Sequence, residues 1–369
     1  MEKRPLHFIF ILLILSSLAC QFGQQAERNN ETEVNNGKGV VATAVAELSS
    51  FSDEETDSEN EVGRSRTSPL PPHTIIQEGQ WTIEILETNR GESAWQAVHL
   101  VNSNNQLPPE GWEYLNVKLR IHNDESSDEV STLTFAVTGD GRVKHYTFNS
   151  GTVPPEPQIP SLLPGKIESE GWETILIHEN ENNLMFVFED LENYSDLPLY
   201  LALDEGASVT VDQAMLENIT RTEFGVTQDQ PVPFGQVATG EDWQIIVLDV
   251  LKGDAAWDKI VEENQFNDPP ESGMEYIMVR LRARYIGFDE HGDYISDTPF
   301  TIRTNSGTEF EAPSLVDPKP TLADTVYPGG EVDGWIVLNA PEKTKNLMVF
   351  FSPDASGAND RYLSLGQGR

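Results

Sequence analysis

The sequence predicts an all-β protein that consists of two tandem antiparallel β-sandwiches, each interrupted by one short helix. Three observations predict this architecture. Apolar and polar residues alternate in short segments, turn-forming residues separate these segments, and the whole pattern recurs at an offset of about 162 residues. Alternation marks strands with one buried face, because side chains two residues apart on a strand point to the same side.

The N-terminal residues predict export and lipidation. Lys3 and Arg4 precede the apolar run 8–15, which is too short to cross a bilayer because a spanning helix needs about 20 apolar residues. The small or apolar residues 16–19 then lead into Cys20, the only cysteine of the chain. This segment resembles the lipobox of bacterial lipoproteins. The resemblance implies a signal peptide over residues 1–19, cleavage before Cys20 and acylation of its thiol. An ordinary secretory signal with an incidental cysteine is the alternative interpretation.

The composition predicts a tether and limits the partners. Residues 20–72 are polar and acidic with few large apolar side chains, which is typical of disordered chain. The protein has 24 basic and 61 acidic residues and a formal net charge of −37. Such a charge disfavours nucleic acid and anionic lipid surfaces as partners. With a single cysteine, the chain has no intrachain disulfide.

The repeat divides the remaining chain into a first domain at 73–207, a linker at 208–221 and a second domain at 222–369. Trp81 recurs as Trp243, and the segment 91–95 recurs as 253–257. In the first copy, predicted strands cover 81–86, 117–122, 133–137, 143–148, 175–177, 184–188 and 200–203. Each domain has an ordinary size for one hydrophobic core.

One helix and one long loop interrupt each copy. After Gly91 and Gly253 the pattern changes to helical spacing, with Trp257, Ile260 and Val261 on one face. We expect this helix to cap an open end of the sandwich. The chain then becomes rich in Asn and Pro, which continue neither a helix nor a central strand. We therefore expect exposed loops at 102–111 and 264–273.

The residues of the second copy carry a family resemblance. Trp243, the segment 253–257, the segment 264–270, Glu275-Tyr276 and the segment 327–330 together resemble an uncharacterised immunoglobulin-like domain of bacterial lipoproteins. The first copy carries the same pattern less completely. The resemblance implies two tandem immunoglobulin-like antiparallel β-sandwiches behind a disordered N-terminal tether. It implies no activity, because the family has none assigned.

Catalytic, metal and cofactor chemistry is poorly supported by the sequence. The Gly-x-Ser-x-Gly, phosphate-loop and His-Glu-x-x-His patterns do not occur. The histidines, including His145 and His178, are interpreted as scattered surface or strand residues. The acidic segment 289–293 offers oxygen ligands for calcium, but its spacing does not match an EF-hand loop and solvated hairpin charges explain it. We therefore expect no enzyme activity, no cofactor and no metal.

The expected function is non-catalytic binding or adhesion by a lipid-anchored extracytoplasmic protein. Candidate ligand-binding residues are Asn102, Asn105, Asn264 and Asn267, because the two long loops contain them at matching positions. A structural role in turns and helix caps is the alternative for the same residues. The expected partners are the membrane, through the lipid on Cys20, and an extracytoplasmic protein or glycan. An accessory subunit of a cell-envelope complex is the second functional hypothesis.

The residue after the cysteine bears on which membrane holds the protein. In lipoproteins of bacteria with two membranes, an aspartate after the acylated cysteine favours retention in the inner membrane. Gln21 occupies that position here, so we expect anchorage to the outer surface, on either the cell membrane or the outer membrane.

Overall fold

The structure is a computed structural model that describes residues 62–125, 130–132, 134–160, 162–189, 197–310 and 312–366. The predicted signal peptide, Cys20 and most of the predicted tether lie outside the described residues. Within these ranges, no helix combines the length and the apolar composition needed to cross a bilayer.

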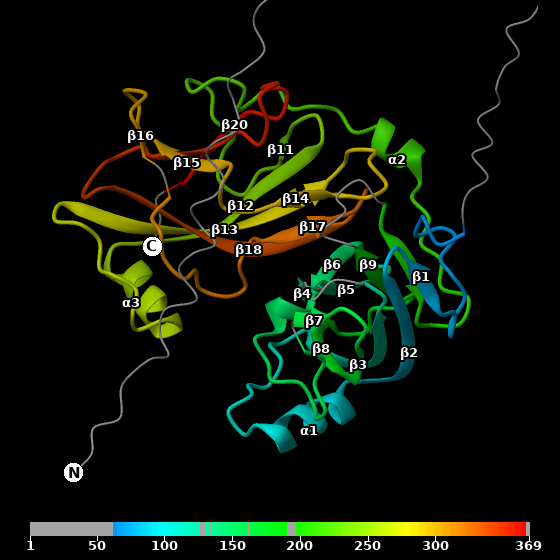
Figure 1. The fold of residues 1–369 in the computed structure, drawn as a ribbon. Coiled ribbons are helices and arrows are strands. Elements are labelled where there is room, and N and C mark those ends of the chain that lie inside the picture. The colour runs from blue at the N-terminus through cyan, green and yellow to red at the C-terminus, as the bar shows by residue number, and fades with distance from the viewer. Residues whose placement is uncertain are drawn as a thin grey trace, which may run out of the picture. The chain divides into compact units, whose positions relative to one another are not determined.

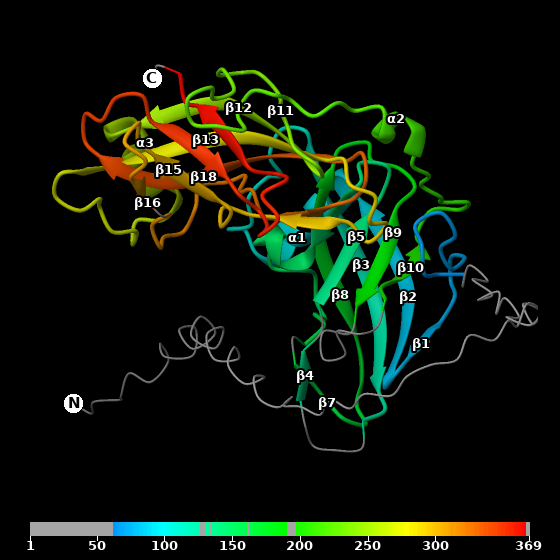
Figure 2. The same ribbon diagram turned by 90° about the horizontal axis from the view of Figure 1, so that it is seen from above.

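The first copy is a sandwich of two antiparallel sheets (Figure 1). One sheet contains, in spatial order, β1 (Ile76–Glu78), β2 (Trp81–Arg90), β3 (Trp112–Asn123) and β8 (Glu168–His178). The facing sheet contains β10 (Leu199–Ala202), β9 (Met185–Glu189), β5 (Thr134–Thr138) and β6 (Val143–Tyr146). A 3-10 helix, η1 (Thr147–Ser150), follows β6, and Figure 2 shows β4 (Val130–Thr132) and β7 (Leu162–Pro164) as a separate pair.

The second copy repeats this arrangement. Its first sheet contains β11 (Ala238–Thr239), β12 (Trp243–Lys252), β13 (Met274–Tyr285) and β18 (Glu331–Pro341). Its second sheet contains β16 (Glu309–Phe310), β15 (Phe300–Arg303), β19 (Met348–Phe351) and β20 (Arg361–Ser364). The two copies share a detail of register, because the pairing shifts between Ile85 and Glu87 in β2 and between Val247 and Asp249 in β12. The fold prediction of all-β antiparallel sandwiches is confirmed.

Each sandwich has its own hydrophobic core. Trp81, Phe186 and Ile121 are among the side chains that fill the first core, and all of its buried members lie between Ile76 and Leu201. Trp243, Phe351 and Leu281 belong to the second core, whose buried members lie between Val232 and Leu365. Alternation explains these cores, since every second residue of β3 and β13 points into the sandwich.

The two predicted helices are present as α1 (Glu92–Val101) and α3 (Asp254–Glu263). Each begins after a glycine with positive φ, 66° at Gly91 and 56° at Gly253, a conformation that strongly favours glycine. The expectation that they cap an open end is wrong. They cover the outer face of the first sheet, where alternation places a second apolar row. Ala94 and Val98 of α1 pack on Tyr114 and Leu176, and α3 packs on the matching row.

Strands of the two copies also pair with each other. The short strands β17 (Asp324–Val326) and β14 (Asp293–Ile295) extend the second sheet of the first copy, because Val326 pairs with Val143 of β6. Beside this pairing, Tyr327 is fully buried with Tyr200, and their ring centroids lie 6.4 Å apart. The linker contains a third helix, α2 (Gln213–Glu217). Independent folding of 73–207 and 222–369 stays a prediction.

The folded chain begins before the predicted start of the first domain. The polar composition predicts a tether up to residue 72, but the described segment from 62 onward packs on β10. The backbone N–H of Leu70 donates to the carbonyl of Tyr200 at 2.8 Å, and that of Tyr200 donates to Gly63 at 2.8 Å. Arg66 is buried and lies over the ring of Tyr327, with 4.1 Å between its guanidinium carbon and the ring centroid.

Candidate functional site

The predicted loops 102–111 and 264–273 contain neither helix nor strand, as expected. In the first loop, the side-chain amide of Asn105 donates to the carbonyls of Val98, at 2.8 Å, and of Val153, at 3.0 Å. Its oxygen accepts the backbone N–H of Val153 at 3.1 Å. Asn105 therefore fixes the end of α1 and the loop to a distant chain segment. Asn102 accepts the N–H of Asn104 at 3.0 Å, which forms an Asx turn.

The second loop repeats these bonds. Asn267 donates to Ile260 at 3.2 Å and to Val316 at 2.9 Å, and it accepts the N–H of Val316 at 2.9 Å. Asn264 accepts the N–H of Phe266 at 3.1 Å in a matching Asx turn. All four candidate asparagines thus hold the loops in shape. Ligand contact through these four residues stays a prediction.

The loops expose apolar side chains beyond this asparagine frame. Leu107 is 68% exposed in the first loop, and Phe266 is 83% exposed in the second. Leu100, near the end of α1, is 87% exposed. The frame is shared by both copies, but the apolar residues occupy different positions. The two loop tips therefore present different surfaces.

A cluster of two histidines and a glutamate lies beside the start of β3, where the loop 102–111 ends. His145 belongs to β6, His178 ends β8, and Glu181 lies in the turn that connects β8 with β9. The His145 Nε2 and the Glu181 Oε2 lie 2.9 Å apart, and the His178 Nδ1 lies 3.8 Å from the same oxygen. One ligand atom from each residue falls within 4.8 Å of the other two. The interpretation of these two histidines as scattered residues is wrong.

Trp112, the first residue of β3, packs against both imidazoles. Its ring centroid lies 4.1 Å from that of His178 and 5.8 Å from that of His145. The side chains of His145 and Glu181 are 3% and 1% exposed, whereas that of His178 is 36% exposed. The cluster is therefore an enclosed site with one histidine open to solvent.

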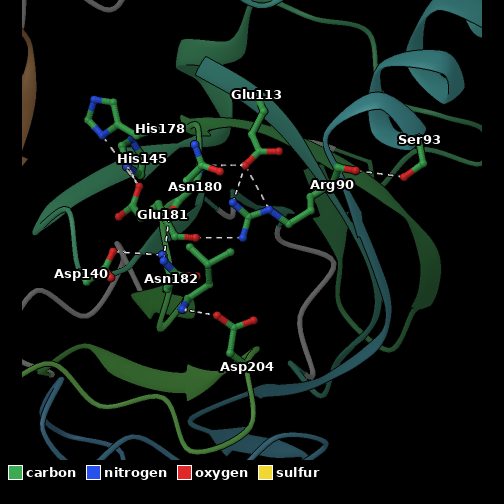
Figure 3. A network of polar contacts seen from close by, with 11 residues as sticks. Arg90, Ser93, Glu113, Asp140, His145, His178, Asn180, Glu181, Asn182 and Asp204 are labelled. Carbon is green, nitrogen blue, oxygen red and sulfur yellow. Dashed lines mark hydrogen bonds and ion pairs between the residues drawn. The ribbon is translucent and has the colours of Figure 1, made fainter. Parts of the chain in front are cut away.

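Backbone contacts fix the turn that carries Glu181 (Figure 3). The Arg90 guanidinium donates to the Glu181 carbonyl at 2.8 Å and pairs with the Glu113 carboxylate. The N–H of Asn182 donates to Asp140 at 2.9 Å. A Cβ on Gly141 would lie 2.8 Å from the Glu181 Oε1, so glycine gives the carboxylate its room. These contacts place Glu181 before any ligand binds.

The surroundings lower the pKa values of both His178 and Glu181. Burial lowers the pKa of His178, and the charge of His145 lowers it further, so its imidazole is neutral at neutral pH. Burial opposes ionisation of Glu181, but the charge and hydrogen bond of His145 hold its pKa below the ordinary value. The site therefore offers a carboxylate and a neutral imidazole side by side.

The acidic segment 289–293 was considered as a calcium loop. Two of its carboxylates accept hydrogen bonds from the protein itself. Asp289 accepts the N–H of His291 at 2.9 Å, and Asp293 accepts the indole N–H of Trp243 at 2.9 Å. The first bond stabilises a turn, and the second satisfies the indole of a core tryptophan. Both roles fit the interpretation of these carboxylates as hairpin charges.

No protein-family model matches this chain. No curated protein matches it either.

Proposed function

We propose that this chain is a lipid-anchored extracytoplasmic protein that binds another macromolecule without catalysis. The observation that carries the proposal is the pair of framed loops. In each copy an asparagine ties the loop to the sandwich through three backbone hydrogen bonds, and a large apolar side chain projects from the loop. Function concentrates on loops that a rigid scaffold holds in place.

The exposed side chains supply the binding free energy in this account. Burying a Leu or Phe side chain contributes about 1.5–3 kcal/mol, and Leu107 and Phe266 are both mostly exposed in the free chain. Because the asparagine bonds already order the loops, little conformational entropy is lost when a partner docks. Preordered apolar tips are therefore suited to recognition.

A protein is the partner that these tips favour, and a glycan is the alternative. Apolar contacts of Leu107 and Phe266 match the apolar core of a protein interface. The net charge of −37 acts against nucleic acid. Because the two tips differ, we propose that they contact different parts of one partner, so that the linked sites raise avidity.

The anchor and the family belong to the same proposal. Acylation of Cys20 and a tether of some tens of residues hold the sandwiches outside the membrane, since two or three acyl chains anchor a protein stably. Sandwich architecture supports the resemblance to the uncharacterised immunoglobulin-like domains of bacterial lipoproteins. A role as an accessory subunit of a cell-envelope complex is the second hypothesis, in which the same loops position an enzyme or transporter.

Photocrosslinking on intact cells tests the proposal. A photoreactive phenylalanine analogue replaces Phe266 in one variant and Phe224 in a matched control. Phe224 is also exposed, at 60%, but lies outside both loops. We expect a discrete crosslinked protein from position 266 and none from position 224.

The alternatives give different results in the same experiment. A crosslinked glycan would show that the partner is a carbohydrate and not a protein. A partner that belongs to an envelope machine would favour the accessory-subunit hypothesis. Equal crosslinking from positions 266 and 224, or none from 266, would contradict binding through the loop.

A further inference from the structure

The cluster of His145, His178 and Glu181 joins the two sheets of the first sandwich. His145 comes from the sheet that contains β6, and His178 comes from the sheet that contains β8. Glu181 reaches both from a turn whose backbone is fixed by side chains of other elements (Figure 3). The three ligand atoms therefore meet through the fold and not through sequence proximity.

The geometry is close to that of a three-ligand metal site. Zinc binds histidine nitrogen and carboxylate oxygen at about 2.0–2.2 Å, so ligand atoms of a tetrahedral site lie about 3.3–3.5 Å apart. Here Glu181 lies 2.9 Å from one imidazole nitrogen and 3.8 Å from the other. All three ligand atoms fall within 4.8 Å. Small side-chain rotations therefore suffice to close the site around an ion.

Glu181 also has unused binding capacity. Its side chain is 1% exposed. Within the described ranges its buried Oε1 makes no hydrogen bond of good geometry, and the backbone of Gly141 is the nearby polar group that helps to lower the Glu181 pKa. Burial of a carboxylate is costly unless the group is paired. The charge and hydrogen bond of His145 offset this cost and keep Glu181 ionised, so the carboxylate is held in the form that coordinates a cation. The Glu181 carboxylate is thus buried, ionised and has one oxygen without a well-formed hydrogen bond.

The second copy has different residues at the positions that are equivalent to the cluster. Pro341 pairs with Met274 as His178 pairs with Trp112. Phe310 pairs with Ile302 as His145 pairs with Val137. The N–H of Thr344 donates to Pro341 in the same turn in which that of Glu181 donates to His178. Met274, Phe310, Pro341 and Thr344 therefore occupy the positions of Trp112, His145, His178 and Glu181.

We infer that the first sandwich binds one divalent transition-metal ion of the zinc class through His145, His178 and Glu181. Two imidazoles and one carboxylate are ligands that such ions prefer. The exposed edge of His178 gives the ion a path from solvent and leaves one position for water or a partner group. This inference replaces the expectation of no metal, and it does not depend on the proposed function.

The test uses the purified full chain after treatment with a chelator. Zinc chloride is titrated in the presence of excess magnesium, which occupies weak sites on the acidic surface, and binding is followed by calorimetry. We expect one saturable site per chain and a higher melting temperature with zinc, because an ion that binds only the folded state stabilises it. Cobalt is expected to give the visible absorption of a low-symmetry site.

Two variants assign the site. His178→Ala removes the exposed ligand, so the fold is expected to persist, while zinc affinity falls by more than about tenfold, since even outer-shell partners contribute about 10–100-fold. His122→Ala is the matched control, because His122 is 37% exposed and pairs with Asp124 outside the cluster. Glu181→Gln, checked by circular dichroism, is expected to lose binding as well. Non-saturable binding, or one-site binding unchanged by His178→Ala, would overturn the inference.

Discussion

The amides of Asn105 and Asn267 make the same three backbone hydrogen bonds in two different sandwiches. Each donates to the carbonyl near the end of the preceding helix, and each exchanges two bonds with one distant valine, Val153 or Val316. The duplication has therefore kept a frame that orders the loop. The exposed residues beyond the frame, Leu107 and Phe266, differ between the copies.

We expect Asn105→Ala to destabilise the protein more than Asn267→Ala. Asn105 is 8% exposed, whereas Asn267 is only partly buried and two of its bonds are exposed. Removing a side chain that leaves buried backbone groups unpaired costs about 1–3 kcal/mol. Chemical denaturation of the two variants measures the difference.

Asn105→Asp serves as the matched control. It keeps the acceptor for the N–H of Val153 but loses the two donated bonds. Its stability is expected to fall below that of Asn105→Ala, because a buried carboxylate oxygen would face the carbonyls of Val98 and Val153. Wild-type stability for Asn105→Ala would show that the asparagine frame is not needed.

Strand alternation and the internal repeat were sufficient to predict the sandwich architecture, both helices and both loops. These features are local, or they repeat at a fixed offset. The direction in which α1 packs was not predictable, because the outer apolar row of Tyr114 and Leu176 becomes visible only when β3 and β8 are in register. The segment 62–72 has a polar sequence and was therefore assigned to the tether. It is held by backbone hydrogen bonds to β10, which do not depend on side-chain type and leave no pattern in the sequence.

The histidine cluster was not predictable from the sequence for a related reason. His145 and His178 are brought together by pairing between strands, and the register of these strands cannot be read from either segment alone. A signal was nevertheless present. Aligned with the second copy, the polar residues His145, His178 and Glu181 replace Phe310, Pro341 and Thr344.

Glu173 is expected to make stability depend on pH. It pairs with Val117 on the core-facing side of β8, and burial raises its pKa from 4.5 to about 7. In the unfolded chain the Glu173 carboxyl ionises near pH 4.5, whereas in the folded chain it stays protonated up to about pH 7. The free energy of unfolding therefore falls as the pH rises from 4.5 to about 7. Glu173→Gln should therefore raise the melting temperature at pH 8 and leave it nearly unchanged at pH 4.

A carboxylate on the same strand provides the opposite control. The pKa of Glu170 is lowered by hydrogen bonds from Lys118 and Arg120. Its contribution is present above its unfolded pKa and is lost as the pH falls through the lower folded value. Glu170→Gln is expected to lower the melting temperature at pH 8, by a small amount because the pair is exposed. Parallel pH profiles for the two variants would contradict this assignment.

The contact between the copies is expected to stabilise both of them. Tyr327 is fully buried beside Tyr200 and beneath Arg66. Removing a large buried aromatic side chain costs about 3–5 kcal/mol, so Tyr327→Ala should lower the free energy of unfolding by that amount. Tyr294→Ala is the control, because Tyr294 is 57% exposed.

Separate fragments test the same contact. Because each copy has its own core, fragments 62–207 and 222–366 are expected to unfold cooperatively by themselves. Each should melt below the intact chain, since isolation exposes the surface around Tyr200 or Tyr327. A fragment without a thermal transition would show that the two copies form one folding unit.

The lipoprotein proposal makes Cys20 the residue that determines where the protein resides. Because residues 8–20 resemble a lipoprotein processing site, Cys20→Ala should move the chain from the membrane fraction to the soluble extracytoplasmic fraction. Intact-mass analysis of the wild type should show acylation at the new N-terminus. An unmodified cysteine, or a membrane fraction that the substitution leaves unchanged, would end the lipoprotein interpretation.

Partner binding by the two loop tips is tested by a double variant. Leu107→Ser with Phe266→Ser changes only exposed side chains, so its melting temperature is expected to match the wild type, because such substitutions usually change stability by less than about 0.5 kcal/mol. Chemical crosslinking on intact cells, followed by mass spectrometry, compares it with the wild type and with Phe224→Ser. We expect the double variant to lose the crosslinked partners that both other proteins retain. An unchanged set of partners in the double variant would contradict the account.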